Sequence, residues 1–321
     1  MTKTTTTTTT LVVLDRTDRL GRADRELLVL ASALGEAHVV VPAVPPDALL
    51  DELGAHGAVT VHAAAAGPGD RLTAPAVALA AAAARETGAR AVLLPNTPEA
   101  KDVAARLGVR LGAGVVTDAT GLDADLVVTK SVLAGGWTTR CRATSPVLVV
   151  TVRPHSVELP AAEPAGAGRP PVRTHEPEDT VPAARVVGRT ELPASGRPAL
   201  TEARVVVAGG RGTGGDFGPL EELADALGGA IGASRAAVDA GWIGPEAQVG
   251  QTGRTVSPQL YVSCGISGAV QQRAGMQTAR LVVAVNKDEQ APVFEIADLG
   301  IVGDLKKVLP QAVEHLRALR G

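Results

Sequence analysis

The stretch Val205-Val206-Val207-Ala208-Gly209-Gly210-Arg211-Gly212-Thr213-Gly214-Gly215 decides how the second half of the chain is interpreted. Its apolar run predicts a buried strand over Arg204–Ala208, and the residues after the glycines predict a helix over Pro219–Leu227. The spacing Gly210-x-Gly212-x-x-Gly215 matches the dinucleotide-binding fingerprint, in which glycines let the backbone approach a pyrophosphate at a helix N-terminus. A flexible glycine-rich turn is the alternative for this stretch alone.

The fingerprint also requires an acidic residue about 20 residues later, at the end of the next strand. The sequence there is Gly232-Ala233-Ser234-Arg235, and the first carboxylate is Asp239. The chain therefore lacks the ribose-binding acid that a pyridine-nucleotide oxidoreductase needs. It also lacks an acid or base for a hydride site, because His315, in the predicted final helix Leu305–Leu319, is expected at the surface.

Three more polar loops are predicted near the ends of strands. They are Val249–Arg254, Ser263–Gly268 after the predicted strand Leu260–Ser263, and Asn286–Asp288 after the predicted strand Leu281–Val285. A further strand is predicted over Val293–Ile296. Ligands of parallel α/β sheets gather at the carboxyl ends of the strands, so the four loops together predict one site for a large nucleotide.

The first half alternates short apolar runs with helical patterns, which predicts a parallel sheet with helices on both faces. The predicted strands are Leu11–Leu14, His38–Val41, Ala58–His62 and Ala91–Leu94. The predicted helices are Asp24–Leu34, Pro46–Leu53, Ala76–Glu86 and Thr97–Leu107, the last with Thr97 as N-cap and Pro98 at its first position. Four strands without long helices follow and predict a β-rich edge of this domain: Gly114–Asp118, Leu126–Ser131, Thr138–Ala143 and Val147–Val152.

The chain therefore divides into a disordered tail (residues 1–10), an N-terminal α/β domain (11–153), a linker (154–200) and a C-terminal doubly wound domain (201–321). The linker holds nine of the 22 prolines, at positions 154, 160, 164, 170, 171, 177, 182, 193 and 198, and such density excludes regular structure for most of its length. A short strand is possible at Arg185–Val187.

Composition excludes several classes of function. The net charge is −3 and only five residues are aromatic, which disfavours nucleic-acid binding. Cys141 and Cys264 lie far apart, so neither a disulfide framework nor a zinc cluster of cysteines is expected. The longest apolar run, Ala74–Ala84, is too short to cross a membrane, and the threonine-rich N-terminus is unlike a signal peptide. We expect a cytoplasmic protein without membrane insertion.

Seven blocks of the second half resemble the α subunits of electron transfer flavoproteins. They are Val205–Gly212, Gly232–Gly241, Gln248–Gly253, Gly265–Ala269, Ala274–Met276, Val285–Asp288 and Ala297–Leu305. The first half resembles the family more loosely, through Leu93–Pro95, Lys101–Gly112 and Thr151–Pro154. The resemblance covers nearly the whole chain, and it implies a nucleotide-hydrolase-like N-terminal α/β domain followed by an FAD-binding domain.

The resemblance implies a heterodimer with a β subunit, and one FAD in the C-terminal domain of this chain. Such proteins carry electrons from acyl-CoA and related dehydrogenases, as in fatty-acid β-oxidation, to a membrane flavoprotein–quinone oxidoreductase. They are electron carriers without a substrate turnover of their own. The partner subunit can hold AMP or, in bifurcating relatives, a second FAD.

By motif position, the resemblance also assigns roles in flavin binding. Arg211 would lie beside the diphosphate or the isoalloxazine, Ser234 would hydrogen-bond the flavin region, and Arg235 would hold its guanidinium against the ring and favour the reduced anion. Thr252 would offer its hydroxyl to flavin N5, with Val249, Gly250 and Gln251 completing the loop. The segment Ser267, Gly268, Ala269, Val270 and Gln271 would cradle the phosphate and ribityl groups. Asn286 and Asp304, with Leu305 beside it, would bind the ADP portion.

One position departs from the family pattern. Many relatives carry Gln-His after Ile-Ser-Gly-Ala, with the imidazole facing flavin C2=O, whereas this chain carries Gln271-Gln272. A Gln amide can donate a hydrogen bond but cannot become cationic. We therefore expect the reduced anion of the flavin to be less stabilised than in relatives with His, unless Arg273 supplies the missing charge.

Two alternatives to an electron carrier remain. The first is the pyridine-nucleotide oxidoreductase considered above. The second is a nucleotide-binding sensor or regulatory protein, which the N-terminal α/β domain would allow and which would carry no visible chromophore.

Overall fold

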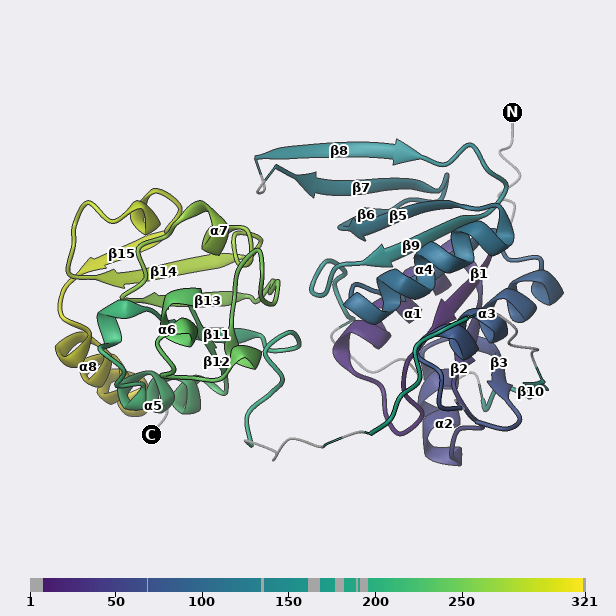
Figure 1. Ribbon diagram of the computed structural model, residues 1–321, viewed down its shortest axis with the longest axis horizontal. Helices are drawn as coiled ribbons and strands as arrows, with labels where there is room; N and C mark the ends of the chain where they lie inside the picture. The colour runs from purple at the N-terminus through teal and green to yellow at the C-terminus, as the bar shows by residue number, and fades with distance from the viewer. Residues whose placement is uncertain are drawn as a thin grey trace. The chain divides into compact units, whose positions relative to one another are not determined.

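The computed structural model describes residues 8–67, 69–133, 136–160, 168–176, 182–188, 190 and 196–319. These residues form two compact units, one made largely of residues before 192 and one made largely of residues after it (Figure 1). None of the helices in these ranges is long and apolar enough to cross a lipid bilayer.

The first unit is built on a seven-stranded parallel sheet with the order β10-β3-β2-β1-β4-β9-β5. Its strands are β1 (Thr8–Val13), β2 (Gly35–Val41), β3 (Ala58–Ala64), β4 (Ala91–Pro95), β5 (Gly114–Ala119), β9 (Leu148–Val152) and β10 (Val172–His175). Its helices are α1 (Arg22–Leu34), α2 (Asp47–Ala55), α3 (Ala74–Thr87) and α4 (Pro98–Leu111). The strands β6 (Gly121–Leu122), β7 (Val127–Val132) and β8 (Trp137–Arg142) form a separate small sheet.

Helices cover both faces of the seven-stranded sheet, as the sequence predicts. Successive side chains of a strand point to opposite faces, so Val12 and Val39 pack with α1 and α2, whereas Val13 and Val40 pack with α3 and α4. The predicted N-cap of α4 is confirmed, because Thr97 Oγ1 accepts a hydrogen bond from the Ala100 amide at 3.1 Å.

Three sequence predictions for this half are wrong in detail. Thr8–Thr10 belong to β1 and pair with β2, because β-branched threonine suits a strand; residues 1–7 of the predicted tail lie outside the described residues. β10 lies within the predicted linker and pairs in parallel with β3. β9 is buried between β4 and β5 and is not part of an edge.

Other parts of the predicted linker also contact the first unit. Arg185 forms an isolated antiparallel bridge with Arg71, and the Val186 amide donates to the Asp70 carbonyl at 2.6 Å. The short strand predicted at Arg185–Val187 is thus reduced to this single bridge. Residues 161–167, 177–181, 189 and 191–195 of the predicted linker lie outside the described residues.

The second unit is built on a five-stranded parallel sheet with the order β12-β11-β13-β14-β15. Its strands are β11 (Val205–Gly209), β12 (Ala230–Ala233), β13 (Leu260–Cys264), β14 (Leu281–Asn286) and β15 (Leu299–Val302). Its helices are α5 (Gly218–Leu227), α6 (Arg235–Asp239), α7 (Val270–Arg273) and α8 (Leu305–Ala318), with the 3₁₀ turns η1 (Arg211–Thr213), η2 (Pro245–Ala247) and η3 (Pro292–Glu295).

The two faces of this second sheet are covered differently. α5 and α8 pack on one face, through Leu220, Leu309 and Val313 among others. The other face is covered mainly by irregular segments that bring Val249, Val256 and Met276 against the sheet. The predicted strand Val293–Ile296 is wrong: this segment is largely η3, which begins at Pro292, and the edge strand is β15.

Candidate functional site

A cavity of about 610 Å³ lies at the carboxyl end of the second sheet. Its walls come from the segments that follow β11, β12, β13 and β14. The chain first adds β12 on one side of β11 and then crosses to add β13 on the other side. The strand order therefore reverses between β11 and β13, although all strands are parallel. Ligands of open α/β sheets bind at such a reversal point.

The glycine-rich loop after β11 is a tightly packed wall of this cavity. A Cβ atom on Gly210 would lie 2.5 Å from the Gly265 carbonyl oxygen, and one on Gly212 would lie 2.6 Å from Gly265 Cα. The Gly212 amide donates to the Gly265 carbonyl at 2.9 Å. The loops after β11 and β13 therefore pack backbone against backbone, which supports a fixed cradle and not the flexible turn considered as its alternative.

The segment after β12 places a serine and an arginine at the cavity. The Ser234 amide donates to the Gly209 carbonyl at 2.9 Å, and Ser234 Oγ is buried without a partner among the described residues. Arg235 opens α6 and is exposed, with Nε 3.3 Å from Asp239 Oδ2. Ser234 and Arg235 occupy the place where a nicotinamide dinucleotide site needs its acid, so the structure gives that alternative no support.

The loop Val249–Thr252 lies beside the end of β12, where Gln248 forms a parallel bridge with Ala233. The Val249 amide donates to the Ala233 carbonyl at 2.9 Å, and the Gln251 amide donates to the Gln271 carbonyl at 2.7 Å. Thr252 Oγ1 accepts a hydrogen bond from Gln248 Nε2 at 3.0 Å. A hydroxyl that accepts in this way still has its own hydrogen to donate.

Gln272 is buried at the wall of the cavity, where it contacts the core. Its Nε2 donates to the Tyr261 hydroxyl at 2.9 Å, while its Oε1 is buried without a partner among the described residues. Burial raises the pKa of Tyr261, so this phenol stays neutral. The Arg273 guanidinium instead donates to the Gly268 carbonyl at 2.6 Å and pairs with Glu295 at 3.0 Å. The charge of Arg273 is thus paired with a carboxylate. Of the two neighbours Gln272 and Arg273, only Gln272 lines the cavity.

Twelve of the sixteen residues assigned from the sequence line the cavity. They are Arg211, Ser234, Arg235, Val249, Gly250, Gln251, Thr252, Ser267, Ala269, Gln271, Gln272 and Asn286. Asn286 also orders its surroundings, because its Nδ2 donates to the Ile266 carbonyl at 3.0 Å.

The other four residues lie beside the cavity lining. Gly268 packs against the backbone of Val293, and Val270 is exposed. Asp304 caps α8 by accepting from the Lys306 amide at 3.0 Å, and Leu305 packs in the core. A role of these four in cofactor binding stays a prediction.

Sequence reasoning missed Asp239, Gln248, Asp288, Ile266 and Ala291, which also line the cavity. Asp239 could have been found from the sequence, because it lies four residues after Arg235 on a short helix and residues at this spacing share a helix face. Gln248 belongs to the block Gln248–Gly253 that resembles the family, but the resemblance assigns no role to it.

The lining fits a flavin dinucleotide. Its volume is within the range of about 300–1,000 Å³ that is usual for cofactor sites. Two arginines match an anionic diphosphate, and the glycine loops let the backbone come close to it. Ser234 Oγ and Gln272 Oε1 are buried polar atoms that need partners, and a flavin with its many polar groups can provide them.

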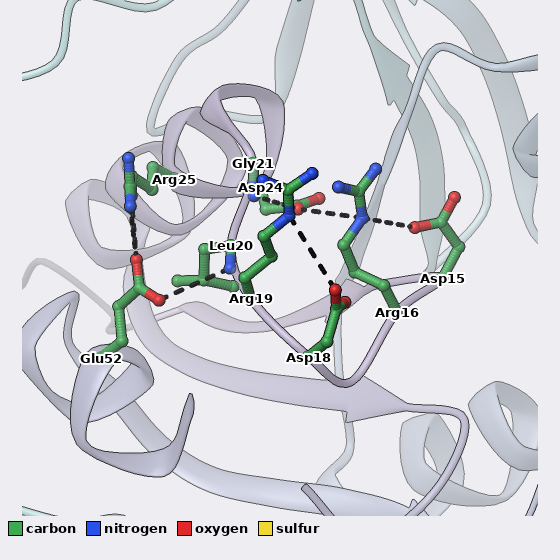
Figure 2. Close-up of polar contacts among 9 residues, drawn as sticks. All are labelled: Asp15, Arg16, Asp18, Arg19, Leu20, Gly21, Asp24, Arg25 and Glu52. Atoms are coloured by element: carbon green, nitrogen blue, oxygen red, sulfur yellow. Dashed lines mark hydrogen bonds and ion pairs between the residues drawn. The ribbon is translucent and has the colours of Figure 1, made fainter. Parts of the chain in front are cut away.

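The first unit also has a cavity, of about 760 Å³, at the carboxyl ends of its strands β1–β4. Its walls are largely aliphatic, with Val13, Leu79 and Leu94 among them. Asp15 lines this cavity from the loop after β1. Figure 2 shows the polar contacts of that loop. That loop is tied to α1 and α2: the Gly21 amide donates to Asp24 at 2.8 Å, and the Leu20 amide donates at 3.5 Å to Glu52, which pairs with Arg25 at 2.6 Å.

Fold and site together define a flavin-dinucleotide-binding domain of the doubly wound type, joined to a second parallel α/β unit. The model of the electron transfer flavoprotein FAD-binding domain matches residues 199–277, and the model of the electron transfer flavoprotein domain matches residues 10–180, more than half of the chain. The chain belongs to the electron transfer flavoprotein family, and its relatives within that family are α subunits.

Three of these relatives show how far the similarity extends; each is named electron transfer flavoprotein subunit alpha. The protein of Mycobacterium leprae is 44% identical over 317 residues, 97% of this chain and 99% of the relative. That of Mycobacterium tuberculosis is 45% identical over 307 residues, 94% and 96%. That of Paracoccus denitrificans is 41% identical over 251 residues, 77% and 79%.

Proposed function

We propose that this chain is the subunit of a heterodimeric electron transfer flavoprotein that holds a single FAD at the β11/β13 cavity. It takes electrons from acyl-CoA and related dehydrogenases and delivers them to a membrane quinone reductase, without a substrate turnover of its own. The observation that carries the proposal is that twelve residues assigned from the sequence gather around one cavity at the reversal point of the sheet. The partner β subunit would hold AMP or a second FAD.

The chain contributes fixed charge and hydrogen-bond donors to this function, while the bound FAD supplies reversible redox chemistry. Arg211 and Arg235 bring two guanidinium groups to the cavity, and this positive charge favours negative charge on the ligand. The Thr252 hydroxyl donates without titrating.

Gln272 would set the potential of the carrier below that of relatives with histidine at this position. Its amide is held by the Tyr261 hydroxyl and cannot become cationic. Among the lining residues, positive charge to stabilise an added electron therefore comes from Arg211 and Arg235. A lower first reduction potential follows, and it favours delivery of electrons to the acceptor over their uptake from the donor.

The test is to co-express the chain with its β subunit, record the visible spectrum, and count FAD per heterodimer. Reduction is then followed with an acyl-CoA dehydrogenase and its substrate. We expect about one FAD and full dehydrogenase-coupled bleaching. Arg235→Ala should weaken FAD retention or lower its potential, whereas Arg317→Ala, an exposed arginine of α8, should change neither.

The opposite result would favour a different class of protein. If no flavin is retained, even after reconstitution with FAD, the electron-carrier proposal fails. A nucleotide-binding sensor then becomes the better hypothesis, and the cavity of the first unit is where its ligand would be sought.

A further inference from the structure

Three of the six histidines gather on neighbouring strands at one edge of the first sheet. They are His38 in β2, His62 in β3 and His175 in β10. In the register of the sheet, His62 is paired with Val40 on one side and with Arg173 on the other. His38 and His175 are each two residues from these partners, so the three imidazoles share one face of the sheet.

The face they share is the one that α3 covers, and α3 adds a carboxylate to the cluster. His62 Nδ1 lies 2.9 Å from His175 Nε2, and His175 Nε2 lies 3.7 Å from Glu86 Oε2. One ligand atom of each of His62, Glu86 and His175 lies within 4.8 Å of those of the other two. His62 is only 1% exposed, and the His175 side chain 12%.

We propose that His62, His175 and Glu86 bind a divalent transition metal, with zinc as the best match. Two imidazole nitrogens and one carboxylate oxygen form a common zinc ligand set. Zinc bonds of about 2.0–2.1 Å place tetrahedral ligand atoms about 3.3 Å apart. The two observed separations lie on either side of that value, so small side-chain movements are enough to bind the ion.

The groups around the three ligands orient them for this task. His62 Nε2 lies 3.4 Å from His38 Nδ1, so a proton on Nε2 points to His38 and leaves Nδ1 free to coordinate. Arg173 holds the other carboxylate oxygen of Glu86, which leaves Oε2 facing His175. Histidine ligands usually have such a partner on the second ring nitrogen, and ligating carboxylates are usually hydrogen-bonded too.

An ion can reach this cluster, and its binding would have a structural effect. His175 lines the cavity of the first unit, which gives the metal a path and leaves space for a water as the fourth ligand. The ligands come from β3, α3 and β10, and β10 is an edge strand that the sheet receives from the proline-rich stretch. The metal would therefore fasten β10 to the rest of the sheet.

The test uses the complete heterodimer after chelation and dialysis, titrated with zinc chloride by calorimetry and with cobalt chloride by visible absorption. We expect one zinc per heterodimer, a tetrahedral cobalt spectrum and slower amide exchange in residues 172–175. His175→Gln and Glu86→Gln should each weaken zinc binding at least tenfold. His315→Gln, an exposed histidine of α8, is the matched control and should bind zinc as the parent protein does.

Two outcomes would overturn the proposal. One is the absence of zinc binding by the parent protein, in which case the cluster would be only a chain of hydrogen-bonded imidazoles. The other is equal binding by the parent protein and both ligand variants. Flavin content is recorded in parallel and should not change, so a failure here is distinguishable from a failure of the proposed function.

Discussion

The two units of this molecule use the same architecture and build different cavities with it. Both have a parallel sheet, a point where the strand order reverses, and a cavity at the carboxyl ends of the strands. In the first unit the walls are largely aliphatic, and pairs of helices cover both faces of the sheet. In the second, glycine loops and arginines form the cavity, and irregular segments cover one face.

The difference shows which part of such a fold determines the kind of ligand that binds. The sheet fixes where a ligand can bind, but the loops after the strands decide what binds there. Close backbone packing between Gly212 and Gly265 is possible only because neither residue has a side chain. Five predictions follow from this contrast, in order of decreasing effect.

The largest effect is expected from Gly212→Ala. The added Cβ would meet Gly265 Cα at 2.6 Å, and backbone cannot move aside as a side chain can, so the cradle should open and flavin should be lost almost completely. The measurement is the flavin-to-protein ratio after gel filtration. Gly214→Asn in the same loop is the control: its φ is +63°, which Asn tolerates, and no heavy atom lies within 4 Å. Full flavin retention by Gly212→Ala would mean that the packed loops are not needed.

The next effect concerns the two cysteines. Burial raises the pKa of the Cys264 thiol to about 12, whereas Cys141 in β8 is partly exposed. At pH 7–9 we expect a thiol reagent to label Cys141 at least a hundredfold faster than Cys264 in the folded protein, and both equally in urea. Labelling is followed by mass spectrometry. Fast reaction of Cys264 would show that the second unit opens readily.

The same shift makes stability depend on pH. An unfolded cysteine has a pKa of about 8.5, so above that pH the unfolded chain loses a proton that folded Cys264 keeps. The contribution of Cys264 is thus fully present below about pH 8.5 and is lost as pH rises toward 12. Cys264→Ala should flatten this decline in urea unfolding measured at pH 8–10.

A smaller effect is expected from Gln272→His, which introduces an imidazole that can become cationic. A charge-assisted hydrogen bond contributes about 1.5–3 kcal/mol, which corresponds to about 60–130 mV as an upper limit. We expect the first reduction potential of the flavin to rise within that limit in spectroelectrochemical titration. Gln277→His, outside the cavity lining, is the control. An unchanged potential in Gln272→His would contradict the role given to this residue.

The smallest effect is expected from Tyr261→Phe. It removes the hydroxyl that accepts from Gln272 Nε2 and leaves a buried amide without this partner, so the free energy of unfolding should fall by about 1–2 kcal/mol. Urea unfolding measures the change. Ser257→Ala, which removes the partly buried contact with Thr278, should cost less. A larger loss in Ser257→Ala than in Tyr261→Phe would contradict the stabilising role given to the hydrogen bond between Gln272 and Tyr261.

Local patterns in the sequence are sufficient for most of the fold. Apolar runs and glycine or proline boundaries place most strands of both sheets to within a few residues, and Thr97 with Pro98 marks the start of α4. Val293–Ile296 misleads because its spacing of apolar residues suits a strand, while Pro292 starts a 3₁₀ turn there. β12 and α6 are too short to be recognised from local signals.

Contacts between distant parts of the chain are where sequence reasoning stops. The cavity of the second unit is predictable, because its loops after β11, β13 and β14 follow recognisable strands and its segments carry family motifs. The histidine cluster is not, because the pairing of β10 with β3 has no local signal. The sequence alone therefore does not indicate that His62 and His175 are neighbours in the sheet.

The late position of β10 has a consequence for how the protein is made. Val172 pairs with Val61, so a ribosome must add about 110 more residues after β3 before this edge of the sheet can close. Until then β3 presents an unpaired edge, which is a hazard for pairing between nascent chains. Pairing across so long a separation is also slow. The first unit should therefore depend on chaperones during synthesis more than the second, whose five strands lie within about 100 consecutive residues.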